Sequence, residues 1–90
     1  MKAIITVLGQ DKPGIIAKVS TALAERNANI LDISQTVLSN NTFAMTMLTD
    51  LSGITGSFGE LKDALDEVAE QLQMEIRLQR EEIFQSMYRV

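Results

Sequence analysis

The residues with the most evident binding chemistry lie near the N-terminus, in the stretch Asp11-Lys12-Pro13-Gly14-Ile15. It lies between a run rich in β-branched residues and an amphipathic pattern, which indicates a loop that joins a strand to a helix. Backbone N–H groups and the positive end of the helix dipole converge at such a position and favour a carboxylate. Gly14 lets a ligand approach the backbone, and Asp11 can accept a hydrogen bond from an ammonium group. The stretch therefore suits a zwitterion such as an amino acid.

The same stretch also has a purely structural interpretation. Asp11 could cap the helix, Pro13 could stiffen its first turn, and Gly14 could permit the tight bend. Turns and ligand sites of this kind use the same residue types. Both interpretations therefore stay open from the residues alone.

The composition argues against most catalytic and metal chemistry. The 90 residues include no Cys and no His, which removes thiol nucleophiles, Ser-His triads, zinc fingers and disulfide scaffolds. An acylphosphatase-type enzyme would need an Arg in the first loop, where the chain offers only Lys12. We therefore predict a protein that is not an enzyme and that has no catalytic residue, no metal site and no cofactor.

Charge and hydropathy also narrow the classes of partner. Eight Lys and Arg against twelve Asp and Glu give a formal net charge of -4, the wrong sign for nucleic-acid binding. An RNA-recognition module would need stacking aromatic residues, and the predicted hairpin strands hold only Phe43. The apolar runs near the N-terminus are too short for a membrane span or a signal segment. We expect a cytoplasmic protein that contacts neither nucleic acid nor a membrane.

The first half of the chain alternates between the periods of strands and helices. Residues 2–8 are rich in β-branched side chains and indicate a strand, and residues 9–14 indicate a turn. From residue 15 to about residue 26, apolar positions recur every three or four residues, as in an amphipathic helix. Residues 30–38 alternate in hydropathy, which is typical of a half-buried strand. After a short polar turn, residues 42–50 alternate again and should form its antiparallel neighbour.

The second half predicts a helix, a strand and a tail. Residues 51–56 indicate a loop, after which Ser57 and Glu60 fit the capping box that opens a helix. The apolar stripe of this helix extends to Leu72, and its acidic face is most simply a solvated surface. Residues 74–78 alternate as a last strand. Residues 81–89 would add a short helix whose apolar side chains lie on one side: Ile83, Phe84, Met87 and Tyr88.

The element order β-α-β-β-α-β predicts one α+β domain of the ferredoxin-like kind over residues 1–90, with a core at about 3–78 and a tail at 79–90. Right-handed crossovers place both helices on one face of a four-stranded antiparallel sheet with the first and third strands in the centre. The other face carries apolar residues such as Ile4 and Leu8. We expect the tail helix, a second subunit or both to cover it, and therefore a homo-oligomer, either a dimer or a tetramer.

The string Asp-Lys-Pro-Gly-Ile at residues 11–15, followed by Ala-Asn-Ile-Leu-Asp-Ile at residues 28–33, resembles the ACT domain, a regulatory module that senses small molecules. The resemblance covers about residues 3–78. It is greatest to stand-alone bacterial ACT-domain proteins of about ninety residues, which are akin to half of the glycine cleavage regulator. It implies a module with no chemistry of its own that commonly binds an amino acid at a subunit interface.

In that family the ligand lies between the first loop and helix start of one subunit and the start of the second strand of another. Carried over to this sequence, the resemblance implies four ligand-binding residues in the loop and helix start and two at the strand start: Gln10, Asp11, Gly14, Ile15, Asn29 and Ile30. Asn29 also has a structural interpretation, as a polar residue that ends a helix-to-strand turn.

Two functions stay open from the sequence. The first is a non-enzymatic regulatory module that binds an amino acid between subunits and acts on a separate regulated protein. The alternative is a protein–protein interaction module or transcription-linked regulator without its own ligand. In that alternative the apolar side of the tail would be a docking helix rather than a stripe that packs on the sheet or a neighbouring subunit.

Overall fold

The computed structural model describes residues 1–81, and its elements follow the predicted order. They are β1 (Lys2–Gln10), α1 (Ile15–Glu25), β2 (Asn29–Val37), β3 (Thr42–Asp50), α2 (Phe58–Leu72) and β4 (Glu75–Arg80). The β1 and β4 strands each end two residues later than the hydropathy pattern indicated. The predicted tail helix over residues 81–89 lies, beyond its first residue, outside the described part of the chain.

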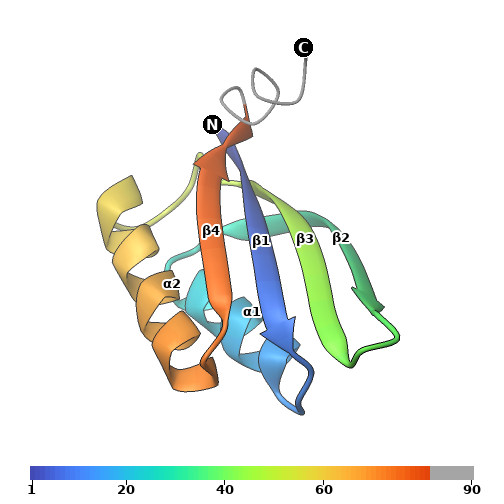
Figure 1. The fold of residues 1–90 in the computed structure, drawn as a ribbon. Coiled ribbons are helices and arrows are strands. Elements are labelled where there is room, and N and C mark those ends of the chain that lie inside the picture. Colours follow the sequence, from blue (N-terminus) through green and yellow to red (C-terminus); the bar gives the residue numbers. More distant parts are fainter. Residues whose placement is uncertain (82–90) are drawn as a thin grey trace.

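The four strands form one antiparallel sheet in the order β2-β3-β1-β4. Both helices pack against the same face of this sheet, and they lie beside each other (Figure 1). The central places of β1 and β3 confirm the predicted ferredoxin-like topology. The arrangement brings the loop between β1 and α1 to the same end of the molecule as the turn between β2 and β3.

The core fills the space between the sheet and the two helices. Ile5 on β1, Leu23 on α1 and Leu61 on α2 are completely buried. The one buried polar side chain among the described residues is Thr49, whose hydroxyl donates a hydrogen bond of 2.9 Å to the carbonyl oxygen of Ala3. The bond satisfies the hydroxyl, so the core carries no unpartnered side-chain polar atom within residues 1–81.

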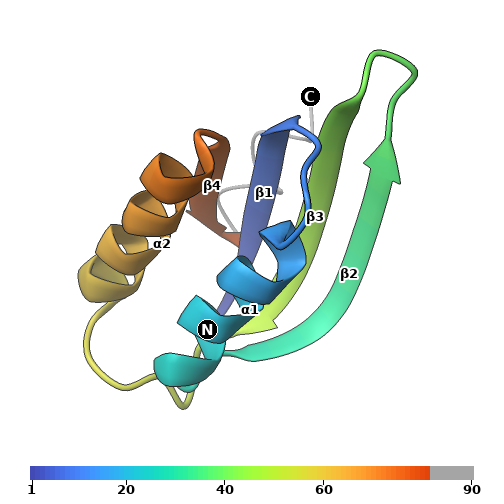
Figure 2. The same cartoon turned by 90° about the horizontal axis from the view of Figure 1, so that it is seen from below.

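The prediction that β2 is half-buried is wrong. Apart from half-buried Ile30, every residue of β2 is exposed, including Leu31, Ile33 and Val37. The reason is that two helices are too few to cover four strands, so the helical layer ends at α1 and leaves β2 beyond it at one edge (Figure 2). A register shift between Ile30 and Asp32 also bends this strand. The alternation in sequence is real, but neither face of β2 has a described helix above it.

The opposite face of the sheet carries no helix among the described residues (Figure 2). On this face Ile4 and Leu48 are half-buried, and Leu8 is 43% exposed. The apolar character that the sequence indicated for this face is therefore present. Neither described helix is long and apolar enough to span a membrane.

Candidate functional site

The loop between β1 and α1 is fastened to two other parts of the chain. On one side the backbone N–H of Asp11 donates a 3.0 Å hydrogen bond to the carbonyl oxygen of Asn41 in the β2–β3 turn. On the other side the Nζ of Lys12 donates to the carbonyl oxygen of Leu72, the last residue of α2. A cation is well placed there, because carbonyl groups at a helix C-terminus carry partial negative charge. Two hydrogen bonds thus fasten the loop to the β2–β3 turn and to the end of α2.

The start of α1 has no side-chain cap. Its N-cap residue is Gly14, with φ 89 and ψ 2, and no side chain bonds to the helix start. The first bond of the helix runs from the N–H of Lys18 to the carbonyl oxygen of Gly14. The N–H groups of Ile15, Ile16 and Ala17 therefore have no acceptor within the helix. This finding contradicts the interpretation of Asp11 as the helix cap.

Helix α2 begins in the opposite way. The Ser57 hydroxyl accepts a 3.1 Å hydrogen bond from the N–H of Glu60, and the Glu60 carboxylate accepts a 3.3 Å bond from the N–H of Ser57. The predicted capping box is therefore confirmed. The chain satisfies the start of α2 with its own side chains, whereas no side chain bonds to the start of α1. The first turn of α1 also contains no acidic residue, so the positive end of its dipole is not compensated from within that turn.

The space beside the start of α1 is open. A Cβ built on Gly14 would have no heavy atom within 4 Å, and Gly14 itself is exposed. Gln10 is exposed at the end of β1, and Asp11 is half-buried. The Ile15 side chain is only 2% exposed and belongs to the core, so this residue can offer a ligand only its backbone N–H. The start of α1 thus presents backbone N–H groups at an open corner, and Asp11 and Gln10 lie a few residues before it in the chain.

The other two predicted site residues lie elsewhere in the same chain. Asn29 and Ile30 begin β2, close to the C-terminal end of α1, whereas the loop lies at its N-terminal end. The 11 residues of α1 separate the two groups by about 16 Å along the helix. One chain therefore does not bring the six residues together. Asn29 and Ile30 instead line a recess of about 400 Å³ together with Ser20, Thr21, Ala24 and Ala28.

A carboxylate lies next to this recess at the end of β3. Asp50 is the cross-strand partner of Asn29. Its carboxylate accepts a 3.0 Å hydrogen bond from the backbone N–H of Ser52. The backbone and side-chain hydrogen bonds of Ser52 lower the pKa of Asp50, which stays ionised at neutral pH. Within residues 1–81 no group of acidic side chains is placed to hold a metal ion.

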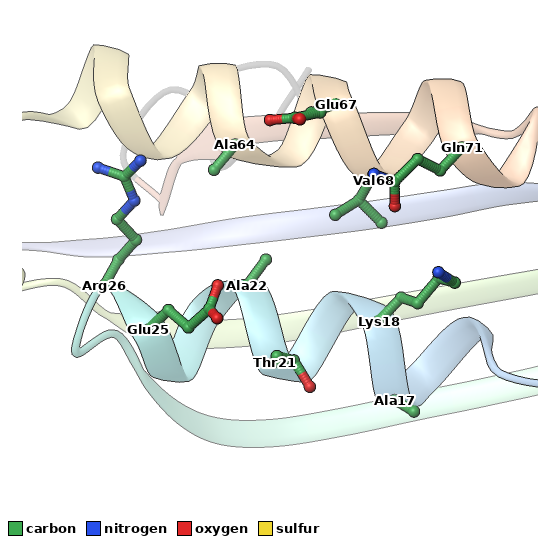
Figure 3. A pocket seen from close by; sticks show the side chains of 10 residues that line it. All are labelled: Ala17, Lys18, Thr21, Ala22, Glu25, Arg26, Ala64, Glu67, Val68 and Gln71. Atoms are coloured by element: carbon green, nitrogen blue, oxygen red, sulfur yellow. The ribbon is translucent and has the colours of Figure 1, made fainter.

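The sequence did not predict a groove between the two helices, shown in Figure 3. Its volume is about 440 Å³, and its lining combines small side chains with charged ones from both helices. The ion pair between Arg26 and Glu60, at 3.5 Å, lies at one end. The frequent alanines of the two helices were the only sequence signal for it. The lining residues are Ala17, Lys18, Thr21, Ala22, Glu25, Arg26, Ala64, Glu67, Val68 and Gln71.

The element order and the four-stranded antiparallel sheet define the class of small ferredoxin-like β-α-β-β-α-β modules. The family model of the ACT domain matches residues 2–79. The chain therefore belongs to the ACT domain family, as the motif at residues 11–15 indicated.

Similarity to individual proteins extends over the whole chain. A UPF0237 protein of Clostridium acetobutylicum is 57% identical over 90 residues, which is 100% of both chains. An ACT domain protein from Streptococcus pneumoniae has a similar structure, with a TM-score of 0.79, 43% identity and 93% of both chains covered.

Two further structures resemble this chain over part of their own length. The regulatory subunit of aspartate kinase from Thermus thermophilus matches 87% of this chain and 50% of its own, with a TM-score of 0.69 and 32% identity. A candidate glycine cleavage system transcriptional repressor matches 88% of this chain and 44% of its own, with a TM-score of 0.71 and 24% identity. The second likeness concerns the fold alone.

Proposed function

We propose that this protein is a non-enzymatic regulatory module that binds an amino acid between two copies of the chain. The observation that carries the proposal is the uncapped start of α1, which opens onto free space at Gly14 in a chain of the ACT family. The N–H groups of residues 15–17 would hold the carboxylate of the ligand, and the Asp11 carboxylate would accept a hydrogen bond from its ammonium group.

The exposed strand β2 supports a site that two copies share. Its outer edge has no partner strand among the described elements, so its backbone N–H and C=O groups can pair with a second copy. Three apolar side chains on it are about half exposed, namely Leu31, Ile33 and Val37. Exposing these apolar side chains does not stabilise a single chain. A two-fold interface would bury the three side chains of both copies.

Antiparallel pairing of two β2 strands would join the separated halves of the site. With the two-fold axis near Ile33, the middle residue of β2, Asn29 of one copy lies opposite Val37 of the other. Val37 ends its strand beside the β2–β3 turn, where Asn41 binds the loop at Asp11. The recess at Asn29 would thus face the β1–α1 loop of the second copy. This geometry supports the split site that the family resemblance implied.

Regulation would follow from the place of the ligand. An amino acid that contacts both copies binds the pair more tightly than the single chain, and it therefore shifts the equilibrium toward the pair. A separate protein that recognises only one of the two states would receive the signal. The aspartate kinase subunit that resembles this chain is described as regulatory, which is consistent with such a role.

Calorimetric titration with each of the twenty amino acids tests the proposal. We expect at least one to bind the full chain with a Kd below about 1 mM. Asp11→Asn should weaken that binding by about 1–3 kcal/mol, because the ammonium group loses a charged acceptor. Asp63→Asn, a substitution on the exposed side of α2, is the matched control and should leave the affinity unchanged.

Two outcomes would contradict the proposal. If no amino acid binds below this limit while the protein is folded and oligomeric, the sensor function is wrong and a pure interaction module is left. If Asp11→Asn and Asp63→Asn bind alike, the amino acid does not use the loop.

A further inference from the structure

The β1–α1 loop and the turn between α2 and β4 lie at the same end of the molecule (Figure 1). Met74, the residue before β4, packs directly on the backbone of Gly9, because a Cβ built on Gly9 would lie 2.8 Å from the Met74 Cγ. A few residues further on, the half-buried Lys12 reaches the carbonyl oxygen of Leu72 with its Nζ. The loop therefore contacts the turn through its backbone and through a side chain.

The C-terminal end of α2 obtains its positive charge from Lys12. A helix leaves its last four carbonyl groups without a partner in the regular helix. The backbone N–H groups of the two residues after α2 donate to the carbonyl oxygens of Ala69 and Glu70, at 3.0 and 3.2 Å. The carbonyl oxygen of Leu72 accepts from Lys12. Because the last turn of α2 contains no basic residue, the cation that a helix C-terminus favours comes from the β1–α1 loop.

The same contact directs the Lys12 ammonium away from its neighbour Asp11. The two residues carry opposite charges, yet neither takes part in an ion pair within residues 1–81. A released Lys12 ammonium would compete with the ammonium group of a ligand for the Asp11 carboxylate. The bond to α2 therefore leaves that carboxylate free of an internal cation.

The loop is supported in different ways on its two sides. On the side of the β2–β3 turn, the support is the backbone bond from Asp11 to Asn41, which a side-chain substitution does not remove. On the side of α2, the hydrogen bond depends on the Lys12 side chain. Gly14 adds no support, because it is conformationally permissive and a Cβ on it would have no heavy atom within 4 Å. Lys12 is thus the support that a substitution can test.

We propose that Lys12 is a positioning residue of the amino-acid site. Its ammonium, held by the C-terminal end of α2, keeps the Asp11 carboxylate in place and free for the ammonium group of the ligand. Lys12 itself does not contact the ligand. The inference rests on the proposed function and assigns to that site a residue outside the six that the family resemblance implied.

Amide hydrogen exchange of the ligand-free protein, followed by NMR, tests whether Lys12 holds the loop. The reporter is the N–H of Asp11, whose bond to Asn41 breaks when the loop moves. Lys12→Met keeps the length of the side chain but removes the donor, and it should speed exchange at Asp11 about tenfold. Lys12→Arg can donate to the same carbonyl group and should stay within about twofold of the unchanged protein. The N–H of Thr55, which donates to the carbonyl oxygen of Arg26 near the other end of α1 at 2.9 Å, should not change.

Calorimetric titration with the twenty amino acids, repeated on each variant, tests the consequence for binding. We expect Lys12→Met to weaken the binding of the tightest amino acid about tenfold and Lys12→Arg to retain it. Lys62→Met is the matched control. It removes the same charge from the exposed side of α2, where Lys62 pairs with Asp66 at 3.0 Å, and it should leave the affinity unchanged.

A double substitution separates positioning from a general structural effect. If Lys12 acts by placing the Asp11 carboxylate, that carboxylate contributes little once Lys12 is lost. Asp11→Asn should then weaken binding by less than about threefold in the Lys12→Met protein, and by more in the unchanged protein. A residue that only stabilises the fold would leave the two losses equal.

Three results would overturn the inference. The first is unchanged exchange at Asp11 in Lys12→Met; if binding were weaker all the same, Lys12 would contact the ligand itself. The second is faster exchange at Asp11 with unchanged affinity. The third is an equal loss from Asp11→Asn with and without Lys12. If the unchanged protein binds no amino acid, the proposed function fails together with the role of Lys12, and this failure is recognised before any variant is compared.

Discussion

Replacing Gly14 by Ala should lower the stability of the protein by an amount that the structure sets. Gly14 has φ 89 and ψ 2, a left-handed conformation that costs an L-residue about 1–2 kcal/mol. Steric overlap adds nothing, because the new Cβ would have no heavy atom within 4 Å. The whole expected loss is therefore about 1–2 kcal/mol. For a domain of this size it corresponds to a decrease in Tm of about 5–15 °C.

Urea unfolding at one fixed protein concentration measures this loss, since assembly would otherwise change the apparent stability. Gly14→Asn is the matched variant. The chain already places Asn27 at φ 59 and Asn41 at φ 63, and Asn tolerates this region better than Ala does. We expect Gly14→Asn to recover part of the loss. The reasoning is refuted if Gly14→Ala changes the free energy of unfolding by less than about 0.3 kcal/mol, or if Asn is as costly as Ala.

Two other substitutions test the ends of α2 and β3. Ser57→Ala should cost about 0.5–2 kcal/mol in urea unfolding, because the N–H of Glu60 loses its acceptor; Ser57→Asp should retain most of the stability, and equal losses would contradict the capping role. The pKa of Asp50 is lowered in the folded protein, chiefly by the hydrogen bond from the backbone N–H of Ser52. The ionised carboxylate therefore stabilises the fold at pH values above its unfolded pKa of about 3.9, and this stabilisation decreases as the pH falls below that value. Asp50→Asn should therefore destabilise the protein at pH 7 and lose this effect in acid, as thermal unfolding across pH would show; a penalty independent of pH would contradict the assignment.

Local patterns were sufficient to predict the element order, the topology and the capping box. Each of these depends on residues close in sequence, such as Ser57 and Glu60, or on a general rule of chain crossover. The exposure of β2 was not predictable in this way. The alternation of Leu31, Asp32 and Ile33 indicates two different faces, but only the number and placement of the helices decide whether either face is covered.

The candidate site was predictable in composition but not in geometry. Sequence reasoning placed Gly14 at the bend, and the structure adds its positive φ and the missing side-chain cap. Spacing alone could not distinguish Asp11 as a cap from Asp11 as a ligand group, because both are compatible with a carboxylate three residues before a glycine. The groove between the helices was missed because it depends on how α1 and α2 lie beside each other in space, which no local pattern specifies.

Helix α1 carries half of the proposed site at each of its two ends, the loop at one and Asn29 at the other. A symmetric pair of chains would therefore contain two identical sites, at opposite ends of the joined β2 strands. The first amino acid would bring the chains together and so complete the second site in advance. Binding curves would then be sigmoidal at low protein concentration. At high protein concentration the pair would form without ligand, and the curves would become hyperbolic. The response to the amino acid would therefore vary with the abundance of the protein itself.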